Sequence, residues 1–260
     1  MARIVIATSD QHLDSAPAGV RDAQLKFFKS LLKRDDVQCI VTVGDLWSMA
    51  IDKTVDDVIK NAHCAAVRDV LRQFADSRPL YLVDGNHDPY STMPKPELAK
   101  FKQWLNIPKA IYAGPTLNKR FAGLPTTYFM HGHQFDPSND FWKGLTGTLK
   151  GILGTKAALA LINWAIGIYL KGKRAPTPTE VRKQDKDSYA LLVEYMHNEM
   201  WKWTLGKKNG YDVCVMGHTH FDEIRHKELA NKTYVNCGAF DGLGNSYVEI
   251  GADGPRLVEW

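Results

Sequence analysis

Short apolar runs, each ended by a turn-forming or polar residue, recur along this chain and restrict the folds it can adopt. Runs of this kind, rich in Val and Ile, are typical of strands buried in a sheet. They lie at Ile4–Ala7, Cys39–Val43, Leu80–Val83, Tyr128–Met130, Val213–Met216 and Tyr234–Val235. A chain of 260 residues is long enough to bury a core around such strands.

Longer amphipathic stretches separate the early runs. Residues 20–34 and 54–76 carry apolar side chains at helical spacing, and helical signals resume over 186–205. Alternation of strands and helices predicts an α/β fold. The last forty residues differ, because several short strands there are separated by glycine-rich turns. We expect those strands to pair antiparallel.

Composition excludes several classes of protein. Hydrophobic residues make up 44% of the chain and charged residues 24%, which is ordinary for a globular protein and excludes a coiled coil, a collagen-like chain or a disordered tail. The four cysteines form no paired metal-binding spacing, which favours a reduced compartment. The first apolar run is too short for the core of a signal peptide. We therefore expect a cytoplasmic protein.

Six of the nine histidines follow predicted strands directly, in short polar clusters. The clusters are Asp10-Gln11-His12, Gly44-Asp45, Gly85-Asn86-His87-Asp88, His131-Gly132-His133 and Gly217-His218-Thr219-His220. Ligands bind beyond the carboxyl ends of strands in α/β sheets. One such cluster is a common turn, but five in succession at strand ends indicate a shared site.

The residue types in these clusters suit divalent transition metals. Carboxylate, amide and imidazole groups without thiolates favour Mn²⁺ first, with Fe or Zn²⁺ as alternatives, over Ca²⁺ or a structural zinc. Two metal ions a few ångströms apart need a bridging carboxylate, and Asp45 is the candidate. The remaining candidate ligands divide into Asp10, His12 and His220 for one ion and Asn86, His131 and His218 for the other.

The same clusters, in the same order, resemble the signature of the calcineurin-like metallophosphoesterases over residues 1–140 and about 186–260. The resemblance implies a four-layer αββα sandwich with a two-metal centre at one edge. It implies hydrolysis of a phosphoester or pyrophosphate bond by a hydroxide that the two metals activate. It also implies that His87 is catalytic, contacting the phosphate and protonating the leaving group, with Asp88 holding His87 in place.

Two details refine the resemblance. Many family members carry a second Asp three residues after the one in Gly-Asp, where this chain has Ser48, so the protein Ser/Thr phosphatases match less well. The run from His131 to Asp136, followed by an insertion, looks most like the UDP-2,3-diacylglucosamine diphosphatase branch. Within that run, His133 is a candidate substrate contact, a group that supports the metal ligands, or an ordinary loop residue.

Residues 141–185 interrupt the core pattern, and we expect them to form a helical lid. The stretch 141–175 has six basic residues and no acid, more charge than the formal net charge of +4 for the whole chain. Within it, Ile152–Leu170 has one charge and would span about 28 Å as a helix, close to the thickness of a bilayer core. A single crossing would place the candidate ligands on opposite sides of the membrane, so the segment must return.

Three interpretations of this segment stay open. It packs against the core or against a second subunit of a homodimer, it lies on an anionic membrane surface, or it lines a pocket for an acyl chain. Its basic residues flank an apolar stretch and do not line an open groove, which disfavours nucleic acid. The protein would then be cytoplasmic and peripheral to a membrane.

The function that these patterns favour is hydrolysis of a small phosphorylated substrate, lipid-linked or nucleotide-linked. A nuclease or a cyclic-nucleotide phosphodiesterase on the same core is one alternative. A non-enzymatic scaffold that retains the metal site is another.

Overall fold

The computed structural model describes residues 3–49, 54–136, 186–206, 210–240 and 245–260. They belong to two compact units, one made of Met1–Gly132 with Met200–Trp260 and the other of His133–Glu199. The fold is mixed α/β, as the alternation of strands and helices predicts. The predicted lid, residues 141–185, lies outside the described residues.

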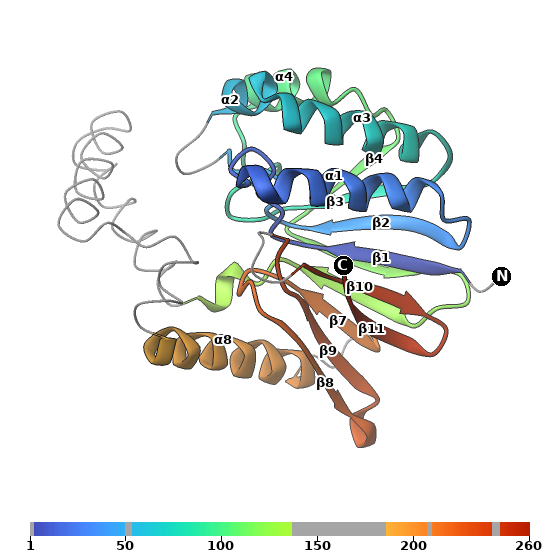
Figure 1. The fold of residues 1–260 in the computed structure, drawn as a ribbon. Helices are drawn as coiled ribbons and strands as arrows, with labels where there is room; N and C mark the ends of the chain where they lie inside the picture. The colour runs from blue at the N-terminus through green and yellow to red at the C-terminus, as the bar shows by residue number, and fades with distance from the viewer. Residues whose placement is uncertain (1–2, 50–53, 137–185, 207–209, 241–244) are drawn as a thin grey trace. The chain divides into compact units, whose positions relative to one another are not determined.

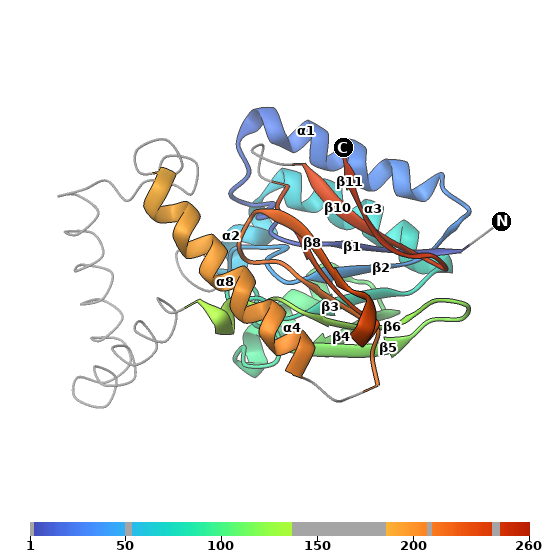
Figure 2. The same cartoon turned by 90° about the horizontal axis from the view of Figure 1, so that it is seen from below.

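A six-stranded sheet forms one half of the larger unit. Its strand order is β11 (Gly254–Glu259), β10 (Ser246–Gly251), β1 (Ile4–Thr8), β2 (Val37–Val43), β3 (Leu80–Val83) and β4 (Ala110–Gly114). Strands β1 to β4 are parallel, and the pair β1 and β2 runs side by side in both views (Figure 1 and Figure 2). Strands β10 and β11 add to the sheet antiparallel, which confirms the expected pairing near the C-terminal end.

A five-stranded sheet forms the other half. Its order is β5 (Thr116–Arg120), β6 (Thr126–Met130), β7 (Val213–Met216), β9 (Lys232–Cys237) and β8 (Asp222–Lys227). The central strands β6, β7 and β9 are parallel, and the edge strands β5 and β8 are antiparallel to their neighbours. All six strands predicted from the apolar runs are present.

Two hydrophobic cores hold the layers together. One fills the space between the sheets, with Val5 and Val41 from the first sheet against Phe129 and Val215 from the second. The other lies between the six-stranded sheet and the helices α1 (Ala18–Leu32), α2 (Val55–Lys60), α3 (Ala62–Ser77) and α4 (Lys95–Leu105). Figure 1 shows α1 and α3 on the side of that sheet away from β7, β8 and β9.

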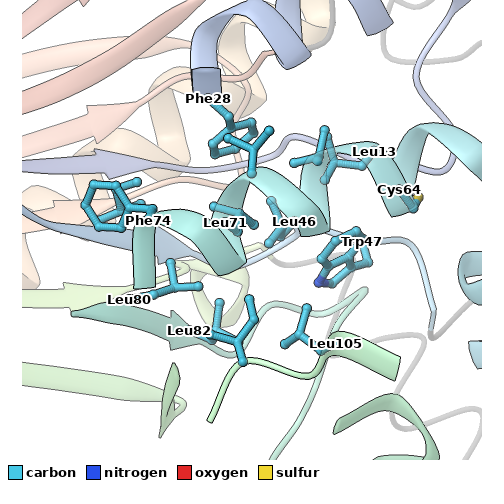
Figure 3. Close-up of a cluster of buried hydrophobic side chains, with 14 of the residues drawn as sticks. Leu13, Phe28, Leu46, Trp47, Cys64, Leu71, Phe74, Leu80, Leu82 and Leu105 are labelled. Atoms are coloured by element: carbon cyan, nitrogen blue, oxygen red, sulfur yellow. The ribbon is translucent and has the colours of Figure 1, made fainter. Parts of the chain in front are cut away.

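The core under α3 shows how the helices dock. Leu71 and Phe74 extend from α3 above Leu80 and Leu82 of β3 (Figure 3). On the outer face of the five-stranded sheet, the last turns of α8 (Lys186–Gly206) supply the fourth layer. There the Tyr234 hydroxyl donates to the sulfur of Met200 at 3.1 Å.

The stretch 54–76, predicted as one helix, is two helices that meet at Asn61. The backbone of Asn61 is extended, at φ −77° and ψ 119°, so it ends α2. Its side chain then accepts hydrogen bonds from the backbone amides of His63 and Cys64 and caps α3. Because the apolar spacing continues across Asn61, the sequence pattern does not reveal the break between the two helices.

None of the helices in the described part of the chain combines the length and apolarity that a membrane crossing requires.

Candidate metal centre

Five parallel strands from the two sheets deliver the polar clusters to one edge of the larger unit. The clusters follow β1, β2 and β3 in one sheet and β6 and β7 in the other. Because parallel strands end at the same edge, residues far apart in sequence meet there. The amide of His218 donates to a carboxylate oxygen of Asp10 at 2.8 Å, across 208 residues of chain.

Most candidate ligands sit in strained backbone conformations. Five of them have positive φ angles: Asp10 (53°), His12 (44°), Asp45 (55°), His218 (72°) and His220 (61°). For residues other than glycine this left-handed region costs about 1–2 kcal/mol each. Strain of this kind clusters at functional sites, because the surrounding structure has to hold it in place.

The first ligand group consists of Asp10, His12 and His220. The Oδ1 atom of Asp10 lies 3.3 Å from Nε2 of His220 and 4.0 Å from Nε2 of His12. Its other oxygen, Oδ2, accepts the hydroxyl of Ser9 at 2.6 Å. Oδ1 is buried and has no hydrogen-bond partner among the described residues, so its negative charge is left for a cation.

The second ligand group consists of Asp45, His131 and His218. Nε2 of His131 lies 3.2 Å from Oδ2 of Asp45 and 3.2 Å from Oδ1 of Asn86. On the other side of the ring, Nδ1 of His131 lies 2.8 Å from the carbonyl oxygen of Val43. Since a carbonyl can only accept, Nδ1 carries the proton and Nε2 is the atom aimed at the site.

Asp45 belongs to the second group and also faces the first. Its Oδ2 atom is 3.2 Å from Nε2 of His131 in one group and 3.8 Å from Nε2 of His12 in the other. Its Oδ1 atom accepts the backbone amide of His87 at 2.9 Å, which fixes the orientation of the carboxylate. A carboxylate in this place can contact ions in both groups.

The electrostatics of the site favour bound cations. Burial lowers the pKa of His12 to about 4, so its ring is neutral at pH 7 and offers a lone pair. Burial also disfavours charge on His131, but the carboxylates of Asp45 and Asp10 outweigh it and raise the pKa to about 10. Burial opposes ionisation of Asp45 as well, yet His131 holds the pKa of that carboxyl well below its usual range.

The donor set fits two divalent ions. It offers carboxylate oxygens, one amide oxygen and imidazole nitrogens, the combination that Mn²⁺, Fe and Zn²⁺ accept. All four cysteines are buried away in the core, so thiolates play no part. The unpartnered Oδ1 of Asp10 and the position of Asp45 between the groups agree with this chemistry.

That Asp88 holds the ring of His87 in place stays a prediction, and the hydrogen bonds that the structure gives Asp88 go to other groups. The Asp88 carboxylate accepts hydrogen bonds, each of 2.9 Å, from the amides of Asp45, Leu46 and Gly85 and from the hydroxyl of Tyr90. Nδ1 of His87 is buried with no hydrogen-bond partner in the described part of the chain. Asp88 therefore joins the loops after β2 and β3. Burial and the charge of Asp45 raise the pKa of Asp88 to about 8, against the effect of the amide hydrogen bonds.

His87 itself lies beside the ligand groups. Its Nε2 atom is 4.0 Å from Oδ2 of Asp45, and its ring meets the ring of His12 edge-on with centroids 4.9 Å apart. The side chain is 24% exposed, so part of the ring is open to solvent beside the ligand groups. His133 belongs to the smaller unit, where it opens a 3₁₀ turn at His133–Phe135, and its role as a substrate contact stays a prediction.

Two serines at the site have no strong sequence signal. The hydroxyl of Ser9 donates to Asp10, and the hydroxyl of Ser48 lies 3.0 Å from Nδ1 of His12. Both are buried. Only their closeness in sequence to Asp10 and Asp45 pointed toward them, because serine is also an ordinary loop residue.

Comparisons with known proteins give one matching family and several similar solved structures. The model of the family described as "Calcineurin-like phosphoesterase" matches residues 4–222. Similar solved structures include vacuolar protein sorting 29 from Cryptosporidium parvum, with 14% identity, a TM-score of 0.45 and coverage of 100% of this chain and 92% of that one. A predicted phosphoesterase from Streptococcus pneumoniae has 12% identity and a TM-score of 0.38, with coverage of 100% and 99%.

A dimetal phosphatase from Danio rerio is similar as well, with 11% identity, a TM-score of 0.41 and coverage of 100% of this chain and 99% of that one. No curated protein matches the sequence.

Proposed function

The chain belongs to the calcineurin-like phosphoesterase family, and from this premise we propose that it is a metal-dependent hydrolase of phosphoester or pyrophosphate bonds. The observation that carries the proposal is the convergence of two ligand groups on one carboxylate. Asp45 lies within 4 Å of a histidine from each group, and the buried Oδ1 of Asp10 has no hydrogen-bond partner within the described ranges.

Each ligand group would hold one ion. Asp10, His12 and His220 would bind the first, Asn86, His131 and His218 the second, and Asp45 would contact both. When bound, two divalent ions, Mn²⁺ first among them, polarise phosphate oxygens and activate water for in-line attack.

The protein's own groups would orient and protonate the substrate. The Val43 carbonyl holds the His131 ring, and the amide of His87 holds Asp45, so the ligands are fixed before substrate arrives. The part-exposed ring of His87 would deliver a proton to the leaving oxygen, a contribution of about 10²–10⁴-fold for a positioned histidine.

For the substrate we propose a small phosphorylated molecule that carries an apolar chain. The support is in the sequence: residues 141–175 are apolar and basic, and the run from His131 to Asp136 resembles the UDP-2,3-diacylglucosamine diphosphatase branch. A cationic apolar segment suits an anionic lipid-linked substrate or the membrane surface that holds it.

The test replaces the shared carboxylate. Asp45→Asn keeps the size of the side chain but removes the charge between the two groups. We expect a loss on the order of 10³-fold in hydrolysis of aryl phosphate monoesters and diesters with added Mn²⁺, because such an ion contributes several kcal/mol. Bound metal, measured by elemental analysis, should fall in parallel.

The matched control is Asp69→Asn on α3. Asp69 pairs with Arg68 at the surface and touches none of the ligand groups, so this variant should retain activity and metal. If wild-type protein holds two metals yet hydrolyses no phosphate ester or pyrophosphate, the hydrolase proposal is wrong and a scaffold role is favoured. Preferred cleavage of DNA or cyclic nucleotides would overturn the lipid-linked substrate only.

A further inference from the structure

Ser48 lies behind the first ligand group, three residues after Asp45. Its side chain is buried, at 3% exposure, and its Oγ atom is 3.0 Å from Nδ1 of His12. The opposite nitrogen of that ring, Nε2, is the one aimed at Asp10 and Asp45. The hydroxyl is therefore on the side of the imidazole that an ion does not use.

The chemistry of imidazole gives this contact a direction. A neutral histidine that binds an ion through Nε2 carries its proton on Nδ1, and that N–H needs an acceptor. The Ser48 hydroxyl is at the right distance to accept it. Without an acceptor the ring can rotate or take the other tautomer, which would put a proton on Nε2 in place of the lone pair.

Ser48 is itself held in place. Its backbone amide donates to Oδ1 of Asp14 at 2.8 Å, and Asp14 is buried. The side chain of Asn61, at the junction of α2 and α3, donates to the backbone carbonyl of Asp14 at 3.1 Å. The hydroxyl of Ser15 also reaches Oγ of Ser48, at 3.2 Å. These hydrogen bonds fix the position of the Ser48 hydroxyl and connect the ligand loop to the helix layer.

The two ligand groups differ in this respect. His131 is oriented by a backbone carbonyl, that of Val43, and its side chain has no exposed surface. His12 is oriented by a side chain and is 17% exposed. A substitution can remove the support of His12 and leave that of His131 intact, so the two groups can be tested separately.

We propose that Ser48 is a positioning residue for the ion held by Asp10, His12 and His220, and that it acts by accepting the Nδ1 hydrogen of His12. The inference rests on the proposed function only in that these residues bind ions; it needs no turnover. Hydrogen-bond partners of metal-binding histidines typically change metal affinity by about 10- to 100-fold.

The experiment is calorimetric titration of the metal-depleted full chain with MnCl₂, comparing wild type with Ser48→Ala, Ser48→Thr and Ser30→Ala. The Ser30 hydroxyl donates to the carbonyl of Phe27 within α1, so Ser30→Ala is the matched control. We expect two binding events in wild type, about tenfold or greater weakening of one of them in Ser48→Ala, and near wild-type affinities in the other two variants.

Titration with Co²⁺ gives a second readout, because its visible spectrum reports ligand geometry. Ser48→Ala should change the spectrum of one equivalent only. Unchanged affinities for both ions in Ser48→Ala would overturn the proposal. So would equal weakening of both, or a Ser48→Thr variant as weak as Ser48→Ala. If wild type binds no ion, both the proposed function and the role of Ser48 are wrong. If wild type binds two ions and Ser48→Ala binds them equally well, only the role of Ser48 is wrong.

Discussion

At Gly85 the candidate metal centre tolerates no side chain. A Cβ atom there would lie 2.0 Å from Oδ1 of Asp45 and 2.4 Å from its backbone nitrogen. Contacts this close force the Asp45 loop to move, and Asp45 is the carboxylate between the two ligand groups. The first residue of the Gly-Asn-His-Asp cluster must therefore be glycine, because atoms of Asp45 already occupy the space that a side chain would need.

Gly85→Ala should therefore impair the site more than one methyl group suggests. We expect a fall of about 10²-fold in hydrolysis with Mn²⁺, because a misplacement near 1 Å is enough for such a loss. Gly19→Ala on α1 is the control, since an added Cβ meets no described atom within 4 Å apart from its chain neighbours and its own helix backbone, and alanine favours a helix. Equal activities in the two variants would contradict the prediction.

The candidate ligands could be named from the sequence, but the residues that hydrogen-bond to them and hold them in place could not. Asp10, His12 and Asp45 follow strands that are buried on both faces, so their place at the sheet edge comes from pattern alone. The partner of Asp88 could not be predicted in this way. Its carboxylate accepts amides of two loops, and that contact depends on loop geometry, which side-chain spacing does not encode.

Among the elements, the buried strands could be placed by their apolar runs, whereas the edge strands of the second sheet could not be placed in this way. Strands β3 and β7 are buried along their whole length and appear in the sequence as apolar runs. Strands β5 and β8 lie at the edges of the second sheet, where their side chains are mostly exposed or half-buried. Polar residues fill such positions, so no apolar run or alternation marks them.

Strand β10 carries a buried acid that connects it to the loop after α1. Glu249, 2% exposed, pairs with Arg34 and accepts Nε of Arg256 at 2.9 Å. Burial alone would raise the pKa of Glu249, but the two guanidinium groups lower it below its ordinary value of 4.5. The charged pair therefore stabilises the fold above pH 4.5, and this stabilisation is lost as the pH falls through the lowered pKa.

Glu249→Gln should reduce the free energy of unfolding at pH 7 by about 2 kcal/mol. This is less than the cost of breaking a fully buried pair, because Arg256 is largely exposed. The difference from wild type should shrink as the pH falls below 4.5 and through the lowered pKa of Glu249, because the wild-type carboxylate then becomes protonated. Urea unfolding at pH 7 and at a series of pH values below 4.5 measures this, with Glu259→Gln, an exposed residue of β11, as control. A difference independent of pH would contradict it.

At the scale of the whole molecule, every candidate ligand lies outside residues 141–175. The ligand loops follow described strands that pair with one another in the two sheets. If the segment serves the apolar part of the substrate, removing it should leave the chemistry of the core unchanged. Composition alone does not predict whether the segment binds the apolar part of a substrate, because an apolar basic stretch suits a protein contact as well as a lipid.

Deleting residues 141–175 should retain hydrolysis of a small aryl phosphate within about threefold, since the candidate ligands keep their contacts. Hydrolysis of a long-chain phosphorylated lipid should fall by at least about tenfold, the loss expected when a few buried methylene groups no longer contribute. Parallel assays with both substrates measure the ratio. Equal loss on both would mean that the segment packs as part of the core.

The pairing of Asp10 with residues near His218 has a consequence for how the protein acquires its ions. Strand β1 pairs with β2 within the first fifty residues, but its other neighbour, β10, and the loop after β7 come about 200 residues later. Contacts of such long sequence separation form late and slowly in folding. A chain that has not yet reached His218 therefore contains two of the three residues of each ligand group, and an ion would find a complete group only once the last strands have formed.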